Sequence, residues 1–129
     1  MSNSEPIEIL LVEDDTVNSQ LFKMMLERLG YQVDLAENGQ EALAKIEQKT
    51  YGLIFMDCQM PVLDGYATTK VLRSQPHHQD TIIIGLTAYA MTEDRERCLE
   101  VGMNDYLTKP LKMSDLSSTI EKWVVRSSP

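Results

Sequence analysis

The fold of this chain is decided by the stretch Leu53-Ile54-Phe55-Met56-Asp57-Cys58-Gln59-Met60-Pro61-Val62-Leu63-Asp64-Gly65. Residues 53–56 are apolar at every position, which is typical of a strand covered on both faces in a parallel sheet flanked by helices. Asp57 ends this strand, and turn residues come after it. Because ligands bind at the carboxyl ends of the strands in open α/β sheets, the sequence predicts that function is located around Asp57.

Strand and helix patterns alternate along the rest of the chain. Residues 7–12 and 81–86 predict further strands, residues 31–36 alternate as in a strand at or near a sheet edge, and residues 104–108 predict a short last strand. Five helices are expected. The first opens at residues 15–18 and ends at Gly30, and the second runs from Asn38 through Ile46. The third covers residues 66–73, the fourth covers 93–101, and the last follows a cap at Ser114. This alternation predicts an α/β fold: a five-stranded parallel sheet in the flavodoxin-like order 2-1-3-4-5, doubly wound, with helices on both faces.

The apolar positions of the helices predict which side chains face the core. The expected buried positions are Phe22, Met25, Leu26 and Leu29, widened by Leu21, in the first helix; Ala67, Val71 and Leu72 in the third; and Cys98, Leu99 and Val101 in the fourth. The stripe of the fourth helix is the thinnest, so we expect that helix to be loosely held and to be the bistable element of the domain.

Length and composition limit the class of protein. The 129 residues are expected to form one domain at residues 7–125, with a flexible lead-in at 1–6 and a tail at 126–129. A net charge of −8 argues against nucleic-acid binding, which needs clustered Lys and Arg. No apolar run approaches the ~20 residues of a membrane span, so we expect a soluble protein without membrane contact. Cys58 and Cys98 are not spaced as in a metal site or a disulfide framework, which fits a reducing cytoplasm. We expect Cys58 to be an inert packing thiol.

Acidic residues follow the first strand as well as the third. If these strands are neighbours, Glu13 and Asp14 lie close to Asp57, and the mutual repulsion of the carboxylates is relieved by a hard divalent cation such as Mg²⁺. Lys109 and Thr87, at the ends of the last two strands, could bind phosphoryl oxygens at the same edge. The reaction class that this arrangement predicts is phosphoryl transfer to Asp57.

Five motifs carry a resemblance to a known family. They are Val12-Glu13-Asp14-Asp15, the stretch from Met56 to Gly65, Leu86-Thr87-Ala88, Tyr106 and Lys109-Pro110. In this order and at the ends of these strands, they resemble the CheY-like receiver domain of two-component response regulators, over nearly the whole chain. The segments Glu13-Asp14 and Cys58-Gln59-Met60-Pro61 are especially similar to receivers attached to hybrid histidine kinases.

The resemblance implies a phosphoacceptor and a metal site. Asp57 would accept a phosphoryl group from a histidine of a histidine kinase or a histidine phosphotransfer domain. Asp14 and Asp57 would ligate Mg²⁺ directly together with the backbone carbonyl of Gln59, whereas Glu13 would act mainly through water. The domain would assist its own phosphorylation and dephosphorylation as a switch rather than act as an enzyme, either alone or as part of a larger hybrid kinase.

The resemblance also implies roles for residues around the acceptor. Lys109 would contact the phosphoryl group, and the Lys109-Pro110 peptide is expected to be cis. Thr87 would move toward a phosphoryl oxygen, and Tyr106 would swing inward into the vacated space. Gln59 and Tyr89, which flank the site, would influence the lifetime of the phosphoryl group.

Two other functions stay open at the level of the sequence. A phosphorylation-independent interaction module could use the same fold. An aspartate-nucleophile phosphatase would want a second aspartate two places after Asp57 as general acid, and Gln59 stands there. A flavodoxin-like FMN carrier is disfavoured, because acids and no phosphate-cradling loop follow Val12.

Overall fold

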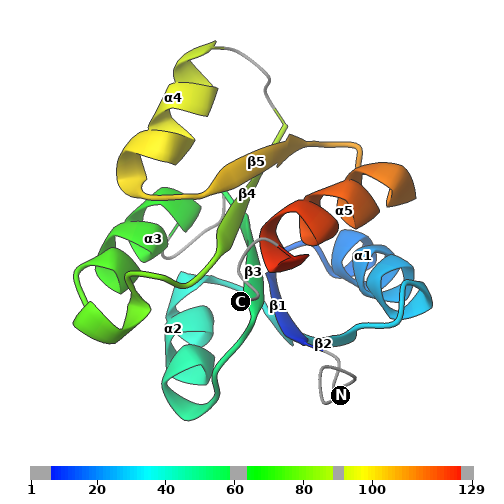
Figure 1. Cartoon of the computed structure of the whole chain (residues 1–129), viewed down its shortest axis with the longest axis horizontal. Helices are drawn as coiled ribbons and strands as arrows, with labels where there is room; N and C mark the ends of the chain where they lie inside the picture. Colours follow the sequence, from blue (N-terminus) through cyan, green and yellow to red (C-terminus); the bar gives the residue numbers. More distant parts are fainter. Residues whose placement is uncertain (1–6, 59–63, 89–91, 126–129) are drawn as a thin grey trace.

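Five parallel strands form one sheet in the order β2-β1-β3-β4-β5, which confirms the predicted topology (Figure 1). This computed structural model describes residues 7–58, 64–88 and 92–125. The strands are β1 (Glu8–Val12), β2 (Gln32–Ala36), β3 (Leu53–Asp57), β4 (Ile83–Thr87) and β5 (Asp105–Thr108). The helices are α1 (Thr16–Arg28), α2 (Gly39–Gln48), α3 (Gly65–Arg73), α4 (Thr92–Val101) and α5 (Met113–Ile120), with short helical turns at Pro76–His78 and Glu121–Val125.

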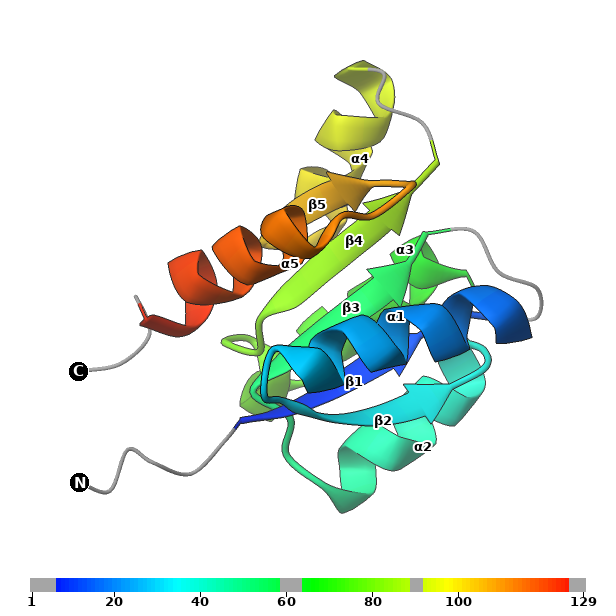
Figure 2. The same cartoon turned by 90° about the vertical axis from the view of Figure 1, so that its right-hand side faces the viewer.

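The helices cover the two faces of the sheet unequally. Helices α1 and α5 pack on one face, where Phe22 and Ile120 belong to the same buried cluster as Phe55 of β3. Helices α2, α3 and α4 pack on the other face, where Ile46 and Cys98 belong to the cluster that surrounds alternate strand residues. Figure 2, which faces α1 and α5, shows these two layers with the sheet between them. The strands β1, β3 and β4 are covered on both faces, as their continuous apolar runs predict.

The predicted edge position of β2 is also confirmed. β2 pairs only with β1 among the described strands, and it buries only Val33 and Ala36 of its five residues. Helix α1 begins as expected, because the Asp15 side chain accepts a hydrogen bond from the Asn18 N–H at 3.0 Å. The chain leaves this helix through Gly30 at a φ of 98°, a left-handed conformation that glycine adopts without strain.

Some of the predicted helix faces are wrong. The side chains of Leu21, Val71 and Leu99 are 53%, 38% and 54% exposed, although the apolar spacing placed them toward the core. Helix α3 instead buries Thr68 and Thr69, whose hydroxyls donate to backbone carbonyls four residues earlier and so remain hydrogen-bonded inside the protein. Apolar spacing could not anticipate buried threonines, and Ala67 is only half-buried.

The expected cap of the last helix is also wrong. Helix α5 begins at Met113, one residue before Ser114, and Lys112 in the N-cap position makes no side-chain cap hydrogen bond. Tertiary packing of Leu116 and Ile120 against the sheet therefore defines this helix. No helix in the described ranges has the length and apolar character that crossing a membrane requires.

Candidate functional site

Three carboxylates meet at the carboxyl edge of the sheet. Asp57 is the last residue of β3, and Glu13 and Asp14 follow β1, whose Val12 pairs in register with Met56. Each of the three residues offers one oxygen, and these oxygens lie within 4.8 Å of one another. Glu13 and Asp57 are buried, whereas Asp14 is exposed. The close approach expected from the order of the strands is therefore present.

Lys109 reaches the same point from the far side of β4. Its Nζ donates to Glu13 Oε2 at 3.0 Å and to Asp57 Oδ2 at 3.2 Å. The backbone N–H of Lys109 donates to the Thr87 carbonyl at 2.8 Å, which fixes this segment against the end of β4. The Lys109–Pro110 peptide is cis, as expected. The direct pairing of Lys109 with Glu13 was not predicted, because the two residues are 96 positions apart in the sequence.

Burial and like charge dominate the electrostatics of this edge. Burial raises the pKa of Glu13 to about 7; the bond from Lys109 opposes this rise, and the nearby Asp57 adds to it. Burial alone would lower the pKa of Lys109, but the bond to Glu13 and the charge of Asp57 outweigh it, so this pKa is raised. The ammonium of Lys109 therefore stays charged and compensates part of the negative charge that the carboxylates bring together.

Gly65 allows the helix after the acceptor strand to lie against the end of that strand. A Cβ at this position would lie 2.2 Å from the backbone oxygen of Asp57 and 2.9 Å from its carbonyl carbon. The N–H of Gly65 donates to the Cys58 carbonyl at 3.2 Å, and the Asp64 side chain caps helix α3 by accepting from the Ala67 N–H at 2.8 Å. A glycine in the acidic turn was visible in the sequence, but its contact with the Asp57 backbone was not.

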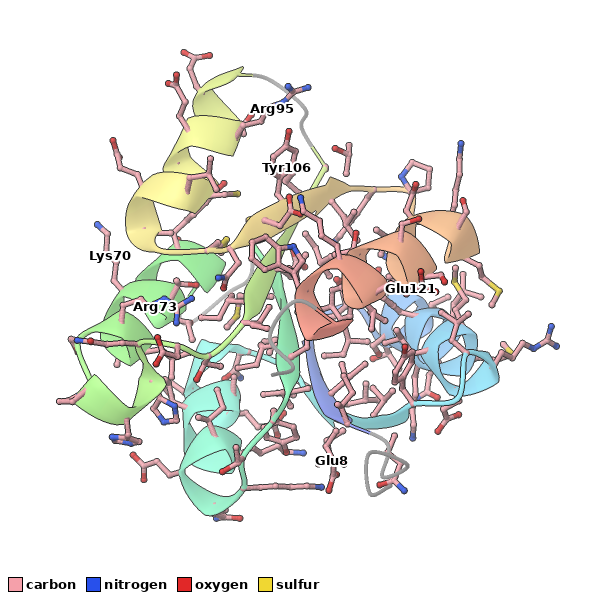
Figure 3. The ribbon with its side chains drawn as sticks, in the orientation of Figure 1. Glu8, Lys70, Arg73, Arg95, Tyr106 and Glu121 are labelled. Atoms are coloured by element: carbon pink, nitrogen blue, oxygen red, sulfur yellow. The ribbon has the colours of Figure 1, made fainter. Side chains whose placement is uncertain are left out.

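The expected switch residues lie on β4, which pairs with the acceptor strand β3, and on β5, the next strand beyond it. Thr87 ends β4 and is buried, while Tyr106 in β5 is half-buried and packs on the α2–α4 face of the sheet. The Arg95 guanidinium lies 5.6 Å from the centre of the Tyr106 ring, and Figure 3 shows both side chains near the start of α4. Gln59 and Tyr89 lie outside the described residues.

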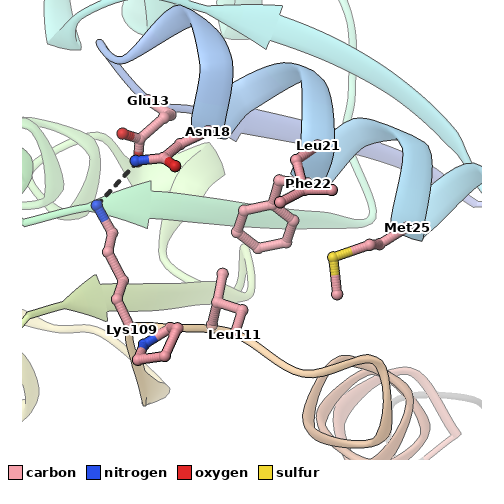
Figure 4. Close-up of a pocket in the computed structure, with 8 residues that line it drawn as sticks. Glu13, Asn18, Leu21, Phe22, Met25, Lys109 and Leu111 are labelled. Carbon is pink, nitrogen blue, oxygen red and sulfur yellow. Dashed lines mark hydrogen bonds and ion pairs between the residues drawn. The ribbon is translucent and has the colours of Figure 1, made fainter.

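A cavity of about 350 Å³ adjoins Lys109 (Figure 4). Its wall includes Leu21, Phe22 and Met25 from α1 and Leu111 from the segment that follows the cis peptide. Nearby on α1, Val17 and Met24 are 77% and 47% exposed. Sequence reasoning missed this apolar surface, because it assigned Leu21 to the core; Val17 and Met24 outside the predicted stripe were the available clue.

The sequence matches a known family over most of its length. The model of the response regulator receiver domain matches residues 9–121. Hybrid signal transduction histidine kinase B of Dictyostelium discoideum is 45% identical over 125 residues, which is 88% of this chain and 6% of that protein. The osmosensing histidine protein kinase SLN1 of Saccharomyces cerevisiae is 39% identical over 127 residues, which is 94% of this chain and 10% of that protein. The chain therefore belongs to the response regulator receiver domain family of two-component phosphorelay signalling.

Solved structures agree in fold. The receiver domain of the sensor histidine kinase PA1611 from Pseudomonas aeruginosa, crystallised with a magnesium ion coordinated in the active site cleft, has a TM-score of 0.87 and 45% identity, covering 94% of this chain and 99% of that one. The receiver domain of Saccharomyces cerevisiae Ssk1, crystallised with the histidine phosphotransfer protein Ypd1, has a TM-score of 0.89 and 34% identity, covering 96% and 92% of the two chains.

Proposed function

We propose that this domain accepts a phosphoryl group on Asp57 from a phosphohistidine of a histidine kinase or a histidine phosphotransfer domain. One observation carries the proposal. Carboxylate oxygens of Glu13, Asp14 and Asp57 lie within 4.8 Å of one another at the sheet edge, and the Lys109 ammonium lies 3.2 Å from Asp57 Oδ2. This is the arrangement that phosphoryl transfer to a carboxylate needs, because the nucleophile has positive charge beside it.

The transfer exchanges one bond for another. A carboxylate oxygen of Asp57 attacks the phosphorus, an O–P bond forms as the N–P bond of the phosphohistidine breaks, and the departing imidazole nitrogen takes up a proton. Lys109 then contacts the phosphoryl oxygens as a fixed positive charge. The Thr87 hydroxyl at the end of β4 donates to one of these oxygens.

The donor set at this edge fits Mg²⁺. Carboxylate oxygens are the hard ligands that this ion prefers, and few of them are needed because water and phosphate complete its octahedron. We assign direct contacts to Asp14 and Asp57 and a water-mediated one to Glu13, with the Gln59 carbonyl as a further ligand outside the described residues. When bound, Mg²⁺ supplies charge neutralisation at the phosphoryl oxygens. The magnesium ion in the PA1611 receiver domain supports this assignment.

The surface beside Lys109 suits a protein donor. Val17, Leu21 and Met24 are exposed on α1, next to the cavity that opens at Lys109. An exposed apolar group beside a charged site is typical of a protein contact surface. A donor domain that covers this surface would bring its phosphohistidine to Asp57. The complex of the Ssk1 receiver domain with Ypd1 supports a partner of this kind. We assign the domain to the cytoplasm, either within or apart from a hybrid kinase.

Phosphorylation would then shift the domain between two states. The single negative charge of the Asp57 carboxylate is replaced by a phosphoryl group that carries roughly two, so the site gains about one negative charge. A coupling of ~1–3 kcal/mol suffices to change partner binding. We assign the moving parts to Thr87, Tyr106 and helix α4, because Tyr106 is half-buried beside this helix. Gln59 and Tyr89 are the positions that we expect to tune the lifetime of the phosphoryl group.

Labelling with a small donor tests the assignment. Acetyl phosphate and Mg²⁺ should add one labile phosphoryl group per chain, and EDTA should prevent it. Asp57→Asn should remove the label, while Asp64→Asn should keep it, because asparagine caps helix α3 nearly as well as aspartate. A persistent label on folded Asp57→Asn protein would refute the acceptor. Release of phosphate over many turnovers without accumulation of the label would instead indicate a phosphatase, and the absence of both label and phosphate release would indicate an interaction module.

A further inference from the structure

Two buried thiols touch across the face of the sheet that α4 covers. The Sγ atoms of Cys58 and Cys98 lie 3.7 Å apart, although the residues are 40 positions apart in the sequence. Both side chains are essentially inaccessible, at 1% and 0% exposure. Cys58 directly follows the acceptor Asp57, and Cys98 belongs to α4. The contact therefore joins the acceptor strand to the helix that we assign to switching.

Gly85 of β4 makes room for this pair. A Cβ on Gly85 would lie 3.3 Å from each of the two sulfurs, so both sit directly over the backbone of this strand. The Sδ atom of Met103 lies closer still, at 2.5 Å from that position, so the two cysteine sulfurs and the Met103 sulfur together occupy the space that glycine leaves.

The two sides of the contact are held with unequal strength. The Cys58 N–H donates to the Leu86 carbonyl at 2.9 Å, and the Cys58 carbonyl accepts from the Gly65 N–H at 3.2 Å, so its backbone is fixed on both sides. Between residues 93 and 101 of α4, only the side chains of Cys98 and Val101 are buried. Helix α4 is therefore the side that can approach or open at low cost.

The sequence alone predicts an inert packing thiol at Cys58, but its contact with Cys98 changes that interpretation. We propose that Cys58 and Cys98 form a reversible redox site, in which a peroxide converts the two thiols to an intramolecular disulfide that links α4 to the end of the acceptor strand. A disulfide needs an S–S distance of about 2.0 Å, so the sulfurs must approach by about 1.7 Å from their separation of 3.7 Å. The movement is of side-chain scale, and α4 supplies it.

The chemistry balances with one peroxide per pair. When α4 opens, the sulfur of one thiol attacks a peroxide oxygen, which breaks the O–O bond and leaves a sulfenic acid and one water. The sulfur of the second thiol attacks the sulfenic sulfur, which forms the S–S bond and releases a second water. The pair loses two electrons and two protons, and a dithiol reductant restores it.

The disulfide would affect switching, and this effect on switching rests on the proposed function. A bond between Cys58 and Cys98 restrains α4 in the arrangement that the structure shows. A phosphorylated state that needs α4 to shift loses its stabilisation, so oxidised protein should carry less phosphoryl group at steady state.

The experiment uses the whole chain, treated with hydrogen peroxide and then unfolded without reductant. Intact-mass measurement should find a monomer that has lost two hydrogen atoms and has no free thiols, and dithiothreitol should restore both. The oxidised protein should unfold at a higher urea concentration than the reduced protein, because the bond closes a loop that is already formed in the native state. Cys98→Ala should show neither change.

Three results would overturn the proposal: disulfide-linked dimers as the main product, sulfinic acids in place of the loss of two hydrogens, or a lower unfolding midpoint after oxidation. Acetyl phosphate labelling separates this inference from the proposed function. Oxidised wild type should carry several-fold less label than reduced wild type, with Cys98→Ala insensitive to peroxide. If the disulfide forms but neither redox state takes the label, the phosphoacceptor assignment fails and the redox site stands. If the protein takes up the label but no disulfide forms, the redox site fails and the phosphoacceptor assignment stands.

Discussion

Gly65→Ala tests the close approach between helix α3 and the acceptor strand. The new Cβ would lie 2.2 Å from the Asp57 backbone oxygen, whereas ordinary contact begins at 3.4 Å, so the two backbones must separate by about 1.2 Å. That separation stretches the Gly65 N–H contact with the Cys58 carbonyl from 3.2 Å beyond hydrogen-bonding range. Overpacking costs about 1–3 kcal/mol and the lost hydrogen bond about 1 kcal/mol, so we expect the free energy of unfolding to fall by about 2–4 kcal/mol.

Urea unfolding, followed by circular dichroism, measures this loss. With a urea dependence of about 2 kcal/mol per molar, the midpoint should fall by about 1–2 M. Because the displaced atoms belong to Asp57, acetyl phosphate labelling should also fall in the fraction that remains folded.

Gly30→Ala is the matched control for Gly65→Ala. Gly30 has a φ of 98° but nothing within 4 Å of a Cβ, so this variant should lose about 1–2 kcal/mol from backbone strain alone and keep its label. A Gly65→Ala protein with the wild-type midpoint and labelling rate would refute the close approach as the reason for glycine.

Three further perturbations probe charge, docking and pH. Lys109→Met should slow acetyl phosphate labelling about a hundredfold, because it removes the ammonium that faces Asp57 Oδ2, while Lys112→Met should not slow it. Leu21→Asp should slow labelling by a phosphohistidine protein at least several-fold but leave acetyl phosphate labelling unchanged, because Leu21 is exposed beside the site. The bond from Lys49 holds the pKa of Asp34 below its usual 3.8; this stabilisation is present above that pH and is lost as pH falls through the lower folded pKa. Asp34→Asn should thus lower the free energy of unfolding near neutral pH by less than about 1 kcal/mol, since the pair is partly exposed, with the difference vanishing in acid.

Each of these perturbations has a contrary result. Equal loss of labelling in the Lys109 and Lys112 variants would show a general charge effect rather than a contact with the acceptor. Equal loss with both donors in Leu21→Asp would place Leu21 in the site and not on a docking surface. A stability difference for Asp34→Asn that persists in acid would show that packing, and not charge, explains it.

The strands and their order could be predicted from the sequence by itself. The continuous apolar runs that end in Thr87 and Asp57 require a sheet covered on both faces, and alternation with helices leaves few right-handed arrangements. The carboxyl ends of neighbouring parallel strands meet at one edge, so the proximity of Glu13 to Asp57 followed from the same pattern. These features depend on the local periodicity of apolar residues, which the sequence shows directly.

The contacts between distant residues were decided only by the tertiary structure. Lys109 reaches Glu13 across β4, the two cysteine sulfurs meet over Gly85, and Leu21 lies at the surface beside the site rather than in the core. Spacing along one helix or strand specifies a face, but the rotation of that face and the space opposite it depend on neighbouring elements. Side-chain reach and close backbone approach are properties of pairs of elements, and no single stretch of sequence contains them.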